Sequence, residues 1–259
     1  MRAPEYRATP TEPDIIRIPR DGANIYECLA VLEGGSHTKR KVATGGDYCS
    51  VQPRTWMTPS MRLAFVWAAL RPWHDLTVPR LMEATGMSRA TAKRAMAGLR
   101  GIVPMSVRIA GPTGRTVVHC IDDPRAFMAA GMASFGAAVI ARILVDGASA
   151  EGLPLAGTSA LASLTDIAAP RTEVRACGRR HLRGLTKASD GVGTEVLALS
   201  YDPTPLAEGG LVDPATLALT CAGRPGAPMG LLPAVALEEA LVDTPWLLAL
   251  AIPIPALVS

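Results

Sequence analysis

Residues 76–99, LTVPRLMEATGMSRATAKRAMAGL, constrain the fold more than any other part of this chain. Thr77 is a suitable N-cap for a helix, and Pro79 falls in the first turn of that helix, where a missing N–H costs nothing. Gly86 tolerates the positive φ that a tight turn between two helices requires. Ser88 can cap a second helix directly after the turn. The sequence therefore predicts a helix, a tight turn and a second helix.

The second helix of this pair is predicted to have two chemically different sides. Its inner side carries apolar residues at helical spacing, namely Ala92, Ala95, Met96 and Leu99. Its outer side carries mostly short polar and basic residues, namely Arg89, Ala90, Thr91, Lys93 and Arg94. Such a helix can rest on a core with one side and enter the major groove of DNA with the other. The pattern is a helix-turn-helix signature.

A β-hairpin is predicted directly after the two helices. Apolar residues alternate along residues 102–110, at Val103, Met105, Val107 and Ile109. Residues 111–114, GPTG, form a turn cluster, and residues 116–121 favour a strand again. A helix-turn-helix followed by a hairpin predicts a winged helix, with Arg108 and Arg115 near the wing.

These residues resemble the winged DNA-binding domains of bacterial regulators, in which the pattern L-x-x-x-T-G-hydrophobic-S-R-x-T opens the recognition helix. The matching positions are Leu81, Thr85, Gly86, Met87, Ser88, Arg89 and Thr91. The chain departs from the pattern at Met82, where alanine is usual, and at Ala92, where a β-branched residue is usual. The resemblance implies DNA binding by the second helix. Two other interpretations stay open, since winged helices also serve as protein-interaction modules and a helical pair with a glycine turn can be plain core.

The charge distribution agrees with DNA binding. Residues 54–125 hold eleven Arg or Lys against four Asp or Glu, whereas residues 126–259 hold eight against twelve. A chain with a formal net charge of only +3 has thus concentrated its positive charge on the segment with the helix-turn-helix pattern. The residues expected to contact DNA are Thr77, Ser88, Arg89, Ala90, Thr91, Lys93, Arg94, Arg100, Arg108 and Arg115.

Composition excludes several other classes of protein. Apolar residues at 49% and charged residues at 19% indicate a folded chain with a sizeable core. Aromatic residues at 4% argue against single-stranded nucleic acid bound on stacked aromatic platforms. The five cysteines are scattered without a CxxC pair, which predicts no disulfide framework or zinc site and fits the reducing cytoplasm. His119 and Cys120 are neighbours on a predicted strand, so they face opposite sides and cannot share a metal.

No membrane segment is expected. The N-terminal residues contain charges but no apolar run typical of a signal peptide. Residues 246–258 are strongly apolar, but they include Pro253 and Pro255 and are shorter than the roughly 20 residues that a spanning helix needs. We expect this tail to pack on the body of the protein or in a subunit interface.

The chain is expected to divide into three parts. Residues 1–54 are a partly flexible arm, whose basic run at 37–41 is either a phosphate-contacting loop or a solvated one. Residues 55–125 form the winged helix-turn-helix domain. Its first helix is predicted over 61–70, with Trp67 and Trp73 in the core.

Residues 126–259 are expected to form a smaller mixed α+β domain for sensing, dimerisation or partner binding. The Ala- and Gly-rich stretch 127–145 is predicted to be a linking or dimerisation helix. Further helices are predicted within 152–169, 178–188, 213–221 and 231–242, and strands over 172–176 and 194–201. The fold class predicted for the whole chain is therefore α+β.

This second half resembles, over short motifs, the C-terminal module of winged-helix proteins grouped with abortive-infection type IV antitoxins. The motifs are LAGTSALASLTDIAAP at 155–170, SYDP at 200–203 and VDPATLAL at 212–219. They place Gly157, Ser159, Ala160, Leu161, Tyr201, Asp202 and Asp213 at family positions. The resemblance implies a protein whose winged helix represses its own operon and whose second domain counters a partner toxin.

Several residues of the second half allow either an enzymatic or a structural interpretation. Carboxylates near the strand at 194–201 could hold Mg²⁺, namely Asp190, Glu195, Asp202 and Asp213. The Asp–Glu-x-Lys arrangement of many nucleases is missing, and Asp-Pro pairs also begin turns and helices. Ser159 lacks the G-x-S-x-G context of a nucleophile. A basic cluster of Arg179, Arg180, Arg183 and Lys187 could bind phosphate or an acidic partner, or be a solvated face. We expect no catalytic residue, cofactor or metal.

The sequence thus predicts a cytoplasmic, sequence-specific binder of double-stranded DNA that acts as a transcriptional regulator, with an autoregulating antitoxin as one form. A second copy of the chain and a cognate toxin are candidate protein partners. The alternative is a DNA-docking replication protein, or a metal-dependent nuclease or nucleotidyltransferase, of a mobile element.

Overall fold

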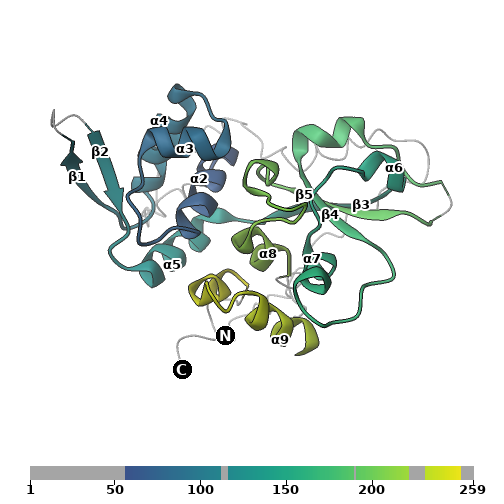
Figure 1. The fold of residues 1–259 in the computed structure, drawn as a ribbon. Coiled ribbons are helices and arrows are strands. Elements are labelled where there is room, and N and C mark those ends of the chain that lie inside the picture. Colours follow the sequence, from purple (N-terminus) through teal and green to yellow (C-terminus); the bar gives the residue numbers. More distant parts are fainter. Residues whose placement is uncertain (1–55, 112–115, 190, 222–230, 252–259) are drawn as a thin grey trace, which may run out of the picture. The chain divides into compact units, whose positions relative to one another are not determined.

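Helices and two small β-sheets make up the fold, which confirms the predicted α+β class (Figure 1). The computed structural model describes residues 56–111, 116–189, 191–221 and 231–251. The arm predicted over 1–54 with its basic run, Arg115, Asp190 and the end of the apolar tail lie outside the described residues. In chain order the elements are α2 (Pro59–Ala69), α3 (Val78–Thr85), α4 (Arg89–Arg100), β1 (Ser106–Ala110), β2 (Thr116–Cys120), α5 (Pro124–Phe135), β3 (Val139–Val145), α6 (Gly147–Ala150), α7 (Gly157–Leu164), β4 (Val174–Gly178), η1 (Arg179–Gly184), β5 (Thr194–Leu199), η2 (Thr204–Leu206), α8 (Pro214–Cys221), α9 (Leu231–Ala240) and η3 (Pro245–Leu250).

The helix–turn–helix segment forms with the caps that its sequence predicts. The Thr77 hydroxyl accepts a hydrogen bond from the N–H of Arg80 at 3.4 Å and so caps α3. Gly86 ends α3 with a φ of 66°, the left-handed region that favours glycine. The Ser88 hydroxyl accepts from the N–H of Thr91 at 3.3 Å and caps α4. Local chemistry is sufficient to set both helix boundaries.

Helix α2 forms the centre of the first half of the structure. Every residue from Leu63 to Ala69 is buried, and α2 contacts α3, α4 and α5. Trp67 is buried in this core, as predicted. The same prediction for Trp73 is wrong, because this side chain follows the end of α2 in a turn and is 69% exposed. Its ring makes an edge contact with Trp246 at a centroid distance of 6.4 Å.

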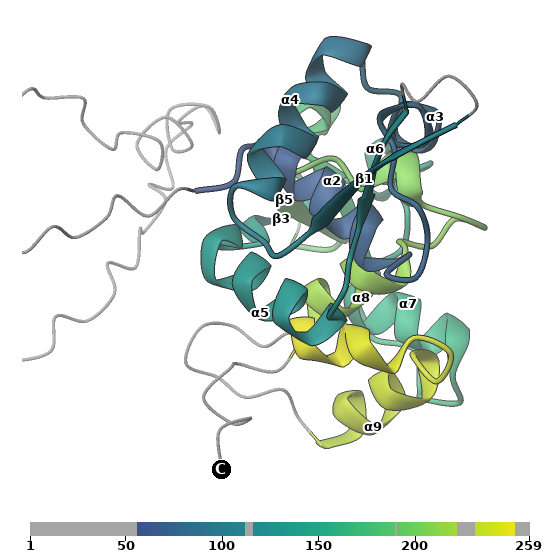
Figure 2. The ribbon, with the colours of Figure 1, turned by 90° about the vertical axis from the view of Figure 1, so that its left-hand side faces the viewer.

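The predicted hairpin is present, although its first strand is shorter than expected. β1 and β2 pair antiparallel (Figure 1), and Figure 2 shows the same hairpin from the side of β1. Residues 102–105 are outside the strand because Ile102 and Val103 both donate to the carbonyl of Leu99 and so prolong the end of α4. Leu76, which lies between α2 and α3, pairs with His119 of β2 through two hydrogen bonds of 2.9 and 3.0 Å. The end of β2 is therefore joined, on the edge that does not pair with β1, to the segment between α2 and α3.

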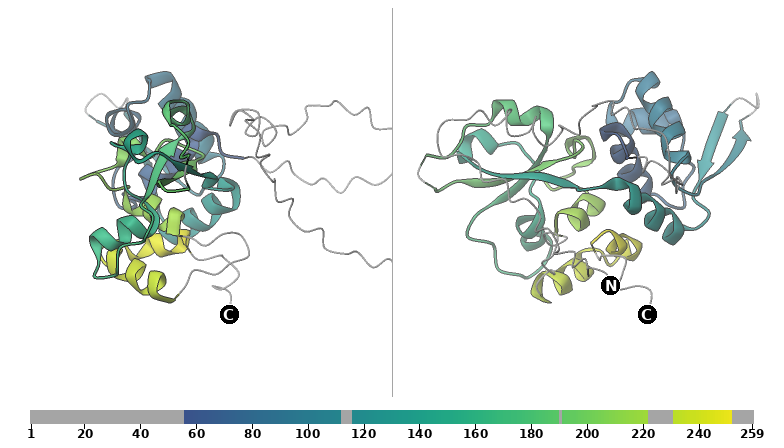
Figure 3. Two further views of the ribbon diagram at one scale, coloured as in Figure 1. Left: turned by 90° about the vertical axis from the view of Figure 1, so that its right-hand side faces the viewer. Right: turned by 180° about the vertical axis from the view of Figure 1, so that it is seen from behind.

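The helix predicted over 127–145 is wrong in its second half. Helix α5 ends at Phe135, Gly136 follows with a φ of 73°, and Val139–Val145 forms strand β3 (Figure 3). The β-branched residues of β3 favour a strand, and β5 supplies an antiparallel partner. Most of the alanines and glycines that suggested one continuous helix lie in α5 and directly after it, and Ala141 is the only one of them within β3.

The second sheet has the strand order β3-β5-β4, with β4 parallel to the central strand β5. Helix α7 packs on β4 and also contacts α8 and α9. The α-helix predicted over 178–188 is instead the short 3₁₀ segment η1. Helices α7, α8 and α9 fall within the ranges predicted for them.

The described part of the apolar tail packs on the body of the protein. Leu247 and Leu250 are buried, and η3 contacts α5 and α8. The indole N–H of Trp246 donates to the carbonyl of Ala69 at 2.8 Å. Among the described residues, no helix combines the length and apolarity needed to cross a membrane.

Candidate nucleic-acid interface

Helix α4 has one buried side and one exposed, basic side. Ala92, Ala95, Met96 and Leu99 are at most 1% exposed and anchor the helix on α2 and α3. The exposed residues of α4 are Arg89, Ala90, Lys93, Arg94, Ala97 and Arg100. The division between the two sides agrees with the sequence prediction. Met96 and Leu99 are among the large side chains that are fully buried, and Ala92 and Ala95 complete the inner side.

The exposed side of α4 has an ordered arrangement of charges. At 3.6 residues per turn, Arg89, Lys93 and Arg100 share one edge of the exposed face, while Arg94 lies on the opposite edge. Ala90 and Ala97 lie between these edges. The centre of the face therefore carries only methyl groups, and cations flank it on both sides. This arrangement lets a partner surface approach the helix backbone closely.

The N-terminal end of α4 is fixed by hydrogen bonds between short polar side chains. The hydroxyls of Ser88 and Thr91 lie 3.0 Å apart, in addition to the capping bond from the Thr91 N–H. On the far flank, Arg94 Nε donates to the carbonyl of Ala90 at 3.3 Å, which holds the start of that side chain against the helix. The guanidinium of Arg94 thus projects from a restrained stem.

Two residues predicted to contact DNA have structural partners instead of free side chains. The Thr77 side chain is buried and is occupied by its capping bond. Arg108 of β1 donates to both carboxylate oxygens of Asp75 at 2.6 Å. This pairing raises the pKa of Arg108, chiefly through the hydrogen bond to Asp75. Arg108 therefore links the hairpin to the segment between α2 and α3.

Arg100 lies near a buried histidine at the base of the hairpin. Burial lowers the pKa of His119, and the positive charge of Arg100 lowers it further. Among the described residues, the buried Nδ1 atom of His119 has no hydrogen-bond partner. The last turn of α4 and the base of the hairpin thus lie next to each other.

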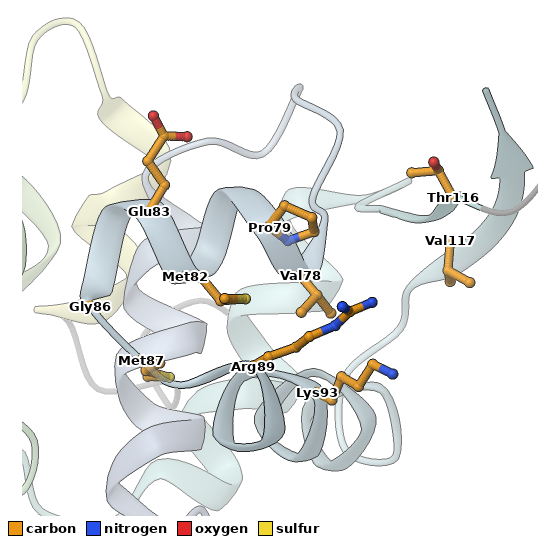
Figure 4. Close-up of a pocket in the computed structure, with 10 residues that line it drawn as sticks. All are labelled: Val78, Pro79, Met82, Glu83, Gly86, Met87, Arg89, Lys93, Thr116 and Val117. Atoms are coloured by element: carbon orange, nitrogen blue, oxygen red, sulfur yellow. The ribbon is translucent and has the colours of Figure 1, made fainter. Parts of the chain in front are cut away.

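A groove lies between α3, the start of α4 and strand β2 (Figure 4). Its volume is about 750 Å³, and its apolar lining comes from Val78, Pro79, Met82, Met87 and Val117. Arg89, Lys93 and Thr116 lie at its polar side. We call this hollow the wing groove. The sequence prediction did not identify this groove. The apolar residues Ile109 and Val117 of the two hairpin strands were a signal for it, because they pair with each other in the structure and remain exposed.

The carboxylates near β5 that the structure describes, Glu195, Asp202 and Asp213, do not converge on a metal site. Glu195 forms an ion pair with Arg142 at 3.0 Å, and Asp202 accepts from the N–H of Thr204 at 3.1 Å. Asp213 is buried at the start of α8. No group of three or more His, Cys, Asp or Glu suited to a metal ion occurs in the described ranges. Each of these acids therefore has a separate structural partner.

The motif residues of the second half join its elements together. The N–H of Gly157 donates to the hydroxyl of Thr220 at 3.2 Å, which ties α7 to α8. The Ser159 hydroxyl accepts from the N–H of Val174 at 2.8 Å, which ties α7 to β4. The Ser159 hydroxyl is thus buried in the core and joins α7 to β4.

A buried polar chain joins the end of β5 to α8. The hydroxyl of Tyr201 lies 2.8 Å from that of Thr216, which donates to Asp213 at 2.5 Å. Burial raises the pKa of Asp213 to about 6 and raises that of Tyr201 well above its usual value. Asp213 also accepts from the N–H of Thr216 at 2.9 Å, and so caps α8 as predicted.

The predicted basic cluster of the second half lies on and after η1. Arg180, Arg183 and Lys187 are exposed, and Arg179 is half-buried. His181 Nδ1 lies 3.8 Å from a carboxylate oxygen of Asp202.

Comparison of the chain with protein-family models, curated proteins and solved structures gave no match.

Proposed function

We propose that this protein is a sequence-specific, double-stranded DNA-binding transcriptional regulator. In this proposal α2, α3, α4 and the β1–β2 hairpin act as a winged helix, with α4 as the recognition helix. The observation that carries the proposal is the exposed face of α4. It combines methyl groups at its centre with edge cations that form no ion pair with any residue that the structure describes.

The shape and chemistry of α4 suit the major groove of DNA. The groove is wide enough for one helix, and the small side chains of Ala90 and Ala97 allow the helix to enter deeply. Arginine can donate two hydrogen bonds to the O6 and N7 atoms of guanine, so Arg89 and Arg94 are the residues proposed to contact base edges. Lys93 and Arg100 are proposed to contact phosphates, together with the N-terminal end of α4 at Ser88 and Thr91.

The hairpin is proposed to contact the phosphate backbone beside α4. Its base is held by the Leu76–His119 pairing and by the Arg108–Asp75 ion pair. A hairpin fixed in this way keeps a constant distance from the recognition helix. Arg115, which directly precedes β2 in the sequence, is proposed as the main phosphate contact of the wing, because Arg108 already has a carboxylate partner.

Residues 126–259 are proposed as a module for pairing, sensing or partner binding. This segment has more acidic than basic residues, which disfavours contact with DNA over most of its surface. Two-fold pairing of regulators matches palindromic sites in DNA, so a second copy of the chain is one proposed partner. In the antitoxin form of the proposal, the partner is a cognate toxin and the winged helix represses the operon that encodes both proteins.

The proposal is tested by selecting bound duplexes from a random-sequence library with the full chain. A base-specific consensus is expected. The single substitutions Arg89→Ala and Arg94→Ala should each weaken binding to that consensus by about 1–3 kcal/mol and relax the preference at one base pair. Arg171→Ala, an exposed arginine of the second half, is the matched control and should leave binding unchanged. A double alanine variant that keeps the wild-type affinity for the consensus and the wild-type preference among sequences would refute the assignment.

A further inference from the structure

The wing groove has a mostly apolar lining. Met82, Met87 and Val78 line one wall, and Val117 of β2 lines the opposite wall. The apolar surface continues along the hairpin, because Val117 is 47% exposed and its cross-strand partner Ile109 is 70% exposed. Apolar side chains concentrated in a hollow favour an apolar occupant.

Two cations face this apolar interior. Arg89 and Lys93 lie one turn apart on α4 and extend into the space between α4 and β2 (Figure 4). Neither forms an ion pair with any residue in the part of the chain that the structure describes. The one acidic residue of the lining, Glu83, points away from them. The groove therefore combines an apolar wall with a local excess of positive charge.

We propose that the wing groove binds a small organic anion with an apolar body and one carboxylate. The volume of about 750 Å³ is within the range of small-molecule sites. The carboxylate would pair with Arg89 and Lys93, and the apolar body would lie between Met82, Met87 and Val117. Methionine side chains adapt their shape to such ligands. A phosphate group of DNA would use the two cations but not the apolar wall.

The proposed ligand also competes with DNA, and this second part rests on the proposed function. Arg89 and Lys93 belong both to the groove and to the exposed face of α4. A carboxylate bound to them neutralises charges that DNA would use, and the apolar body obstructs the approach of the duplex between α4 and the hairpin. The ligand is thus an effector that releases the protein from DNA.

The binding site is tested with 2-naphthoate as the probe and 2-naphthamide as its neutral counterpart. In the full chain with ¹³C-labelled methionine methyl groups, 2-naphthoate should shift the signals of Met82 and Met87 but not that of the buried Met96. Naphthamide should bind at least tenfold more weakly. Equal binding of both probes, no binding of 2-naphthoate, or binding without shifts at Met82 and Met87 would overturn the proposal.

Two variants separate loss of the site from loss of the fold. Val117→Asp and Met87→Gln should each weaken 2-naphthoate binding at least tenfold while the thermal unfolding midpoint stays within a few degrees. Val192→Asp is the matched control, because Val192 is 83% exposed and lies in the second half. Unchanged 2-naphthoate binding by both groove variants would place the probe elsewhere and refute the site.

Competition with DNA is measured separately on the selected consensus duplex. The apparent Kd for DNA should rise linearly with the concentration of 2-naphthoate for the wild-type chain. Simultaneous binding without mutual effect would overturn the effector role. A chain that binds 2-naphthoate in the groove but binds no duplex would refute the proposed function and leave the ligand site standing. A chain that binds duplex DNA but does not bind 2-naphthoate would refute the ligand site and leave the proposed function standing.

Discussion

Arg108 and Asp75, which are 33 residues apart in the chain, form an ion pair in which one guanidinium nitrogen lies 2.6 Å from both carboxylate oxygens. Asp75 directly precedes Leu76, whose backbone pairs with β2. The ion pair and the backbone pairing therefore connect the hairpin to the same segment between α2 and α3. Arg108 was expected from the sequence to contact DNA, yet its charge is balanced within the protein.

Removing the partner of Arg108 should increase attraction to DNA. Asp75→Asn frees the guanidinium and removes one negative charge, so we expect tighter binding to all duplexes and a salt slope steeper by roughly one unit. The slope is measured from affinities over a series of salt concentrations. Asp166→Asn, an exposed acid of the second half, is the control for net charge alone. The same gain in both variants would show that the ion pair does not restrain Arg108.

Enlarging the centre of the α4 face should block entry into the major groove. Ala90→Leu and Ala97→Leu place bulk between the cationic edges at exposed positions, so folding is expected to be unaffected. DNA affinity should fall at least tenfold, about 1.4 kcal/mol or more. Ala133→Leu at an exposed position of α5 is the matched control. Unchanged DNA affinity in a gel-shift assay would mean that this face does not enter the groove.

The buried Asp213 should make stability depend on pH. Its folded pKa of about 6 is above the ordinary value of 3.8, so the folded state binds the proton more tightly than the unfolded state does. The resulting stabilisation is complete below pH 4 and is lost as the pH rises through 6, by about 3 kcal/mol in total. Asp213→Asn keeps a capping oxygen and removes the titration. Urea unfolding should therefore show the variant gaining on wild type between pH 4 and 7, and a constant difference would contradict the assignment.

The contact between α2 and α5 should not tolerate one added methyl group. A Cβ at Gly131 would lie 2.0 Å from the ring of Phe65, which stacks on Phe127 at a centroid distance of 5.1 Å. Gly131→Ala should therefore reduce the free energy of unfolding by about 1–3 kcal/mol. Gly184→Ala, where a Cβ would meet nothing within 4 Å, is the control and should be close to neutral. Equal midpoints for the two variants would mean that α5 packs differently on α2.

Sequence reasoning failed where the deciding partner is distant in the chain. The stretch 127–145 looked like one helix, but β5 supplies a strand partner for Val139–Val145 about fifty residues further on. Trp73 was predicted to be a core residue, but it lies in a turn, where its side chain is largely exposed and its ring contacts Trp246. The residue types in these two segments do not indicate that β5 or Trp246 will be their neighbour.

The sequence by itself determined the helix–turn–helix segment, its caps and the division of α4 into an apolar and a basic side. These features depend on residues at most four positions apart, so the local backbone and the nearest side chains are sufficient to specify them. The tertiary structure alone decided that Asp75 neutralises Arg108, that Val117 faces Met82 across a groove, and that Asp213 is buried beside Tyr201. Such contacts depend on how separate elements pack, because packing brings together groups that are far apart along the chain and removes them from water.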